Sequence, residues 1–91
     1  MDVRSLPGHE LILQGLRDLE SGLESVEALL VAVGAHRLRR AGLPVPEPLP
    51  ADPEHRLYAL LAYDDPDSAH GRYNALIRQL VSFERAAECA A

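Results

Sequence analysis

The chain has 91 residues and a formal net charge of −5, because 14 acidic residues outnumber nine basic residues, all of them arginine. This length allows one domain with a modest core, and the excess of acid disfavours a nucleic-acid partner, whose phosphates require a basic face. No run approaches the roughly 20 apolar residues of a membrane-spanning helix, so we expect no membrane partner. Residues 1–10 lack the order of a signal peptide, so we expect a cytoplasmic location.

The apolar composition favours helices. Apolar residues make up 47% of the chain, and its only aromatic residues are Tyr58, Tyr63, Tyr73 and Phe83. A core of leucine, valine and alanine suits helices better than sheets. The sequence therefore predicts an all-α fold with a single helical domain over residues 1–91. We expect a small helical bundle, built on a long antiparallel helical hairpin with a short intervening helix and completed by dimerisation.

A long first helix is predicted over about residues 7–41. Its apolar residues recur at alternating intervals of three and four, which is the a and d pattern of a heptad repeat. Gly42 follows at the position where a left-handed residue would end the helix. The pattern defines a first packing seam that consists of Leu16, Leu19, Leu23, Val26, Leu30 and Val33.

Ser21 and Gly22 form a typical turn sequence, so two shorter helices that meet there are the alternative to one long helix. A tight turn ordinarily shifts the heptad phase, yet Leu19, Leu23 and Val26 keep that phase across the site. We therefore predict one continuous helix. Gly22 costs it about 1 kcal/mol relative to alanine and is the place for a kink.

Three glycines lie on one line of this predicted helix, because Gly8, Gly15 and Gly22 are spaced seven residues apart. Two explanations are open. Either the spacing is accidental, or the absence of Cβ atoms lets a neighbouring helix approach closely along that line. In the second case the close contact is confined to the first half of the helix, because Leu29 occupies the next step.

Residues 43–53 form a connector. They contain five prolines, which exclude a helix and favour an extended, polyproline-like chain. Eleven extended residues span only about 35 Å, which is too short to return along a helix of about 50 Å. The connector therefore favours an antiparallel arrangement of the helices that it joins.

A short helix is predicted over about residues 53–63. Asp52 is a suitable N-cap residue, and Pro53 suits the first helical position because the amide proton that it lacks would be unpaired there. We expect this helix to bury Leu57, Leu60 and Leu61.

A last helix is predicted over about residues 66–88, with Asp65 as its cap. Its heptad phase does not continue the leucines of the short helix, so a bend is expected at the acidic turn 64–67. The turn lacks the glycine and the spacing of a calcium loop, which favours helix capping over cation binding. The principal members of this second packing seam are Tyr73, Leu76, Leu80 and Phe83.

No pattern for catalysis or metal binding is evident. The four histidines, His9, His36, His55 and His70, have no local spacing of metal ligands. Cys89 is the only cysteine, which excludes an internal disulfide and a cysteine-based zinc site. We therefore predict no catalytic residue, no cofactor and no metal.

A small basic patch follows the first seam. Arg37, Arg39 and Arg40 lie near the predicted end of the first helix, where positive charge compensates the helix dipole. The alternative is a functional one, in which these arginines contact an anion or an acidic partner.

These features favour a non-enzymatic helical module for protein–protein interaction, or a small subunit. A helix of about 50 Å is longer than a globule of this size, so its seam needs cover, and a homodimer is the commonest way to supply it. Another protein is the second candidate partner. The alternative function is that of a small helical enzyme or a nucleic-acid-acting protein, with a site across the dimer that uses His9, His70 or the arginines of the basic patch.

Overall fold

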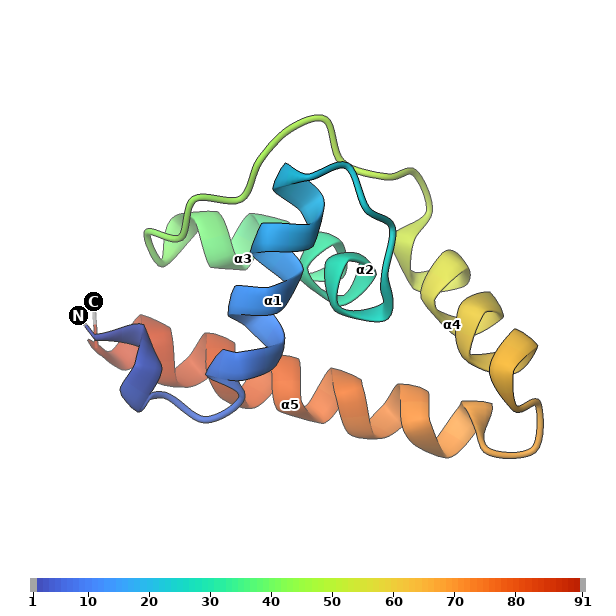
Figure 1. Ribbon diagram of the computed structural model, residues 1–91. Coiled ribbons are helices and arrows are strands. Elements are labelled where there is room, and N and C mark those ends of the chain that lie inside the picture. The colour runs from blue at the N-terminus through green and yellow to red at the C-terminus, as the bar shows by residue number, and fades with distance from the viewer. Residues whose placement is uncertain (1, 91) are drawn as a thin grey trace.

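The computed structural model describes residues 2–90, and within them it contains helices and no strand (Figure 1). The predicted all-α fold is therefore confirmed. The elements are the short 3-10 helix η1 (Val3–Ser5) and the helices α1 (His9–Glu20), α2 (Val26–Val33), α3 (Ala35–Arg40), α4 (Pro53–Asp64) and α5 (Ala69–Ala90).

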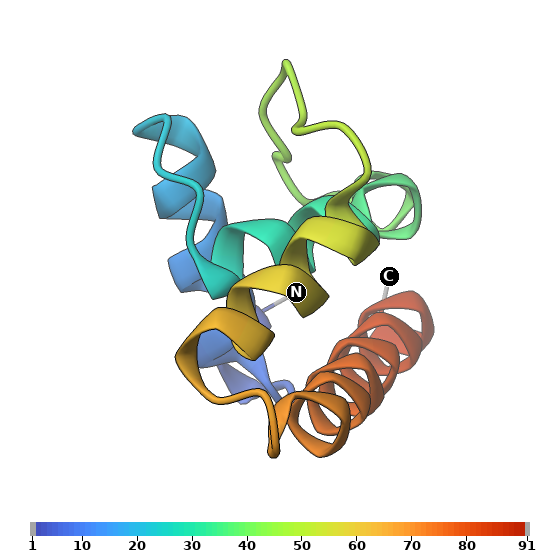
Figure 2. The same cartoon turned by 90° about the vertical axis from the view of Figure 1, so that its right-hand side faces the viewer.

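Helix α2 is the centre of the fold. It contacts α1, α4 and α5, and Figures 1 and 2 show these three helices on different sides of it. Residues 28–32 of α2 are all buried. An apolar helix without a polar face is stable in water only when neighbours cover it on several sides, which is the arrangement seen here.

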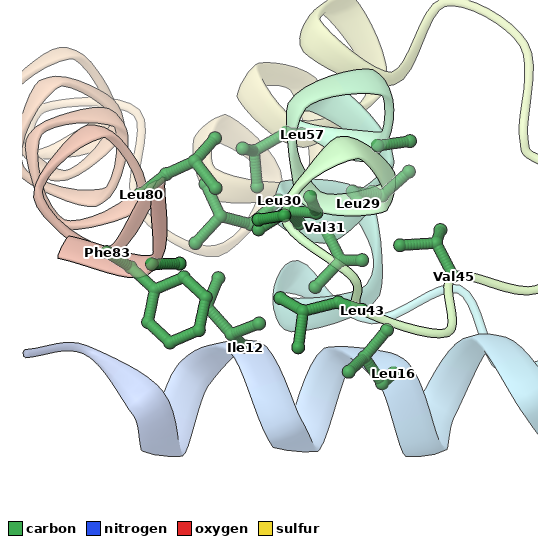
Figure 3. Close-up of a cluster of buried hydrophobic side chains, with 14 of the residues drawn as sticks. Ile12, Leu16, Leu29, Leu30, Val31, Leu43, Val45, Leu57, Leu80 and Phe83 are labelled. Atoms are coloured by element: carbon green, nitrogen blue, oxygen red, sulfur yellow. The ribbon is translucent and has the colours of Figure 1, made fainter. Parts of the chain in front are cut away.

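The core lies between α2 and the helices around it (Figure 3). Phe83 of α5 points toward Ile12 of α1, Leu80 of α5 points toward Leu30 of α2, and the connector contributes Leu43 and Val45 from the other side. The side chains of Phe83 and Ile12 are at most 1% exposed. The connector is thus part of the core as well as a link between helices.

The prediction of one continuous helix over residues 7–41 is wrong, because α1 ends at Glu20. Gly22 has a φ of 76°, which is the left-handed conformation. The amide of Leu23 donates to the carbonyl oxygen of Asp18 at 2.8 Å, and the amide of Gly22 donates to that of Leu19 at 3.1 Å. This pair of bonds is a Schellman motif, which ends an α-helix by satisfying its last carbonyls.

Helix α2 begins with a side-chain cap. The hydroxyl oxygen of Ser25 accepts from the amide of Ala28 at 3.0 Å, and the same hydroxyl donates to the carboxylate of Asp18 at 2.5 Å. Asp18 also accepts from the amide nitrogen of the Gln14 side chain at 2.8 Å. The bonds from Ser25 and Gln14 lower the pKa of Asp18 below its usual value. The carboxylate of Asp18 therefore ties the end of α1 to the start of α2.

Close helix approach explains one of the three aligned glycines. A Cβ atom on Gly15 would overlap the carbonyl oxygen of Glu27 and the side chain of Val31, so α1 and α2 cross backbone to backbone at this residue. Gly8 and Gly22 have other roles, because both adopt positive φ values, Gly8 at the N-cap position of α1 and Gly22 in the turn.

Two further glycines mark helix boundaries: Gly34 separates α2 from α3, and Gly42 follows the end of α3. Helices α2 and α3 meet at Gly34, where an added Cβ atom would lie 2.6 Å from a carboxylate oxygen of Glu84 and 2.9 Å from Leu80. Helix α5 therefore packs directly on the backbone at this junction. Gly42 has a φ of 97° and ends α3, as the sequence predicts.

Helix α4 differs from expectation in two side chains. Asp52 occupies the N-cap position before Pro53 but has a φ of 47° and makes no side-chain cap. Leu57 and Leu61 are buried, whereas Leu60 is 37% exposed, so the expectation that Leu60 is buried is wrong. Leu60 lies about 100° around the helix from Leu61 and misses the face that covers α2.

The last helix begins at Ala69, three residues later than residue 66. Asp65 is not its cap. Its carboxylate accepts from the amide of Asp67 at 3.2 Å, inside the turn that separates α4 from α5. The helices α4 and α5 therefore change direction at the acidic turn, as Figure 1 shows.

The residues of the two predicted packing seams differ in burial. Leu23 is 58% exposed because it lies in the turn after α1, so its expected place on a seam is wrong. The other members pack in or against the core: Leu16, Leu30, Leu80 and Phe83 are buried, and Leu19, Val26, Val33, Tyr73 and Leu76 are partly buried.

The broken first helix changes the reason to expect a dimer. Of the two long helices predicted for the hairpin, only the second is present as a single helix, α5. The longest dimension of the described chain is 37 Å. A helix of about 50 Å that protrudes from the globule is therefore absent. In this fold, no protruding helix among the described residues requires cover by a second copy.

Candidate functional site

The basic patch is largely occupied by contacts within the chain. The guanidinium of Arg37 lies 3.2 Å from Glu84 and 2.6 Å from Glu88, and its bond to Glu88 raises the pKa of Arg37 and lowers that of Glu88. Arg39 donates to the carbonyl oxygens of Val45 and Pro46 at 3.3 Å and pairs with Glu47. Arg40 is exposed. Two of the three arginines thus hold α5 and the connector in place, and anion contact by this patch stays a prediction.

Glu84 is the most deeply buried ionisable side chain of this region. Only 4% of its side chain is exposed, and burial raises its pKa while Arg37 acts in the opposite direction. One of its oxygens packs on the backbone at Gly34. Glu84 therefore serves the docking of α5 on the junction between α2 and α3.

The histidines do not gather at a site. His36, His55 and His70 are exposed on three different helices, and the Nδ1 atom of His9 lies 3.0 Å from the carbonyl oxygen of Leu6. Within residues 2–90, no group of three or more histidine, cysteine or acidic side chains is placed to hold a metal ion. In the acidic turn, Asp64 accepts from Arg72 at 2.9 Å.

A shallow, open groove passes from α1, across the start of α2, to α5, and its first part is lined by η1, α1 and α2 without any residue of α5. It consists of three adjoining hollows of about 480, 410 and 310 Å³. The first two share Leu11 and Glu27, and the second and third share Ala75 and Gln79. Its apolar lining includes Leu11, Leu13, Val26, Ala75 and Leu76.

Arginines line this groove, and two of them are already in ion pairs within the chain, Arg4 with Asp2 and Arg72 with Asp64. Four of the nine arginines line it, namely Arg4, Arg17, Arg72 and Arg78. Only two of the 14 acidic residues do so, Glu10 and Glu27. We call it the arginine groove. Its residues come from η1, α1, α2 and α5, so the tertiary fold brings together arginines that no sequence motif connects.

Large apolar side chains are exposed on α4. Tyr63 is 91% exposed and Leu60 is 37% exposed. A separation of three residues places them on neighbouring positions of one helix face. We call this pair the α4 strip. The sequence pattern predicts that Leu60 is buried and assigns no role to Tyr63. Both are exposed because α4 covers α2 with the face that carries Leu57 and Leu61.

Leu23 is the remaining strongly exposed leucine. It lines a separate hollow of about 230 Å³ together with Leu19, Leu49 and two prolines of the connector. This hollow lies at the turn between α1 and α2, away from the arginine groove, and shares no lining residue with it.

No protein-family model matches the chain, and no curated protein or solved structure is significantly similar to it. None of the helices within residues 2–90 combines the length and the apolar character needed to cross a bilayer.

Proposed function

We propose that this protein is a non-enzymatic helical module for protein–protein interaction, and that it associates with itself as a homodimer. The observation that carries the proposal is the α4 strip, in which Tyr63 is 91% exposed beside the partly exposed Leu60. Single exposed apolar residues are ordinary on protein surfaces, whereas adjoining ones beside a groove are typical of interaction sites.

The chemistry of the strip suits an interface. Tyrosine is enriched among the residues that contribute most to binding, because its ring buries a large area while its hydroxyl remains hydrogen-bonded. Tyr63 and Leu60 belong to a helix that packs on the core through Leu57 and Leu61. The strip is thus presented on a rigid support, which reduces the entropy lost on binding.

An enzymatic or nucleic-acid-acting role has weaker support. The basic patch assigned to that role has Arg37 and Arg39 in ion pairs within the chain. His9 and His70 belong to different helices, α1 and α5, and His70 lies 3.2 Å from the side-chain amide of Asn74. We therefore retain the interaction module as the single proposed function.

Light scattering of the purified chain over a range of concentrations tests the proposal. The expected mass is twice the monomer mass of 10.0 kDa. A Leu60→Ser/Tyr63→Ser variant is expected to shift toward monomer. Leu23→Ser is the matched control, because Leu23 is a comparably exposed apolar residue outside the strip, and it is expected to remain dimeric. A wild-type chain that stays monomeric at about 100 μM would overturn the proposal.

A further inference from the structure

We draw no further inference here: the strongest candidate, the hollow of about 210 Å³ where α5 packs on the junction between α2 and α3, has its buried charge, Glu84, already paired with Arg37 of the same chain, and nothing in the structure shows what would cover its apolar walls.

Discussion

The buried carboxylate of Glu84 lies 3.2 Å from the guanidinium of Arg37, and this ion pair joins the last helix to α3 across 47 residues of sequence. The acid is 4% exposed and the base is 41% exposed, so the desolvation cost falls mainly on Glu84. A buried charge of this kind is tolerated only while its partner is present.

Removal of the partner should therefore destabilise the protein in a pH-dependent way. Burial raises the pKa of Glu84 above its usual value of 4.5. At pH values just above 4.5 the folded state therefore binds more protons than the unfolded state. As pH rises further and Glu84 ionises, the free energy of unfolding decreases. The bond from Arg37 lowers the pKa of Glu88, which adds stability at high pH that is lost on acidification. Both effects predict that Arg37→Gln is more destabilising at about pH 8 than at about pH 4.5.

Urea unfolding of Arg37→Gln at the two pH values checks this prediction. The double variant Arg37→Gln/Glu84→Gln is the control, because it removes the buried charge together with its partner, and it should recover part of the stability lost at high pH. An equal loss of stability at both pH values would contradict the assigned role of the pair.

The break between α1 and α2 can be tested by comparing two leucines of the first predicted seam. Leu30 is fully buried and Leu23 is 58% exposed. Leu30→Ala should lower the free energy of unfolding by about 2–5 kcal/mol, while Leu23→Ala should change it by less than about 0.5 kcal/mol. Chemical denaturation measures both. Similar losses at the two positions would instead favour one continuous seam.

The close crossing of α1 and α2 predicts a large effect of one methyl group. A Cβ atom on Gly15 would overlap backbone atoms of Glu27, so Gly15→Ala should cost about 1–3 kcal/mol or more despite the higher helix propensity of alanine. At Gly71 in α5, nothing lies within 4 Å of an added Cβ atom, so Gly71→Ala should stabilise by roughly 0.5–1 kcal/mol. Thermal or urea unfolding of the two variants is the comparison, and a neutral Gly15→Ala would refute the crossing.

The cap at the start of α2 gives a further prediction. Ser25→Ala removes the acceptor for the amide of Ala28 and the donor to Asp18, and should lower the free energy of unfolding by about 0.5–2 kcal/mol. Loss of the donor should also raise the pKa of Asp18 toward its usual value, because the bond from Ser25 is the main cause of its decrease. Carbon-detected NMR titration of the Asp18 carboxyl reports this change. An unchanged pKa would show that Ser25 does not hold the carboxylate.

Local sequence signals predict the helical content and several helix ends, because each depends on a few neighbouring residues. Gly42 ends α3 in the left-handed conformation, and Pro53 begins α4, as expected. The break after Glu20 is missed although Gly22 and Ser25 both signal it. The spacing of apolar residues happens to continue through the turn, and periodicity alone does not distinguish one helix from two that bury the same stripe.

The candidate surfaces could not be predicted in the same way, since they depend on tertiary contacts. Tyr63 is exposed because α4 covers α2 with Leu57 and Leu61 and turns its adjoining face outward. The arginine groove draws residues from both ends of the chain, from Arg4 to Arg78. The ion pairing of the predicted basic patch also depends on tertiary contacts, because Arg37 and Glu84 are brought together only by folding.

Isotope-filtered NMR on a mixed dimer is the most direct test of the central claim that the α4 strip of one copy contacts a second copy. Equal amounts of carbon-13-labelled and unlabelled chain are combined, and only contacts between copies are recorded. The account predicts cross-peaks from the ring protons of Tyr63 to protons of the other copy. A monomeric sample, or a dimeric sample in which the ring of Tyr63 shows no contact with the other copy, would contradict it.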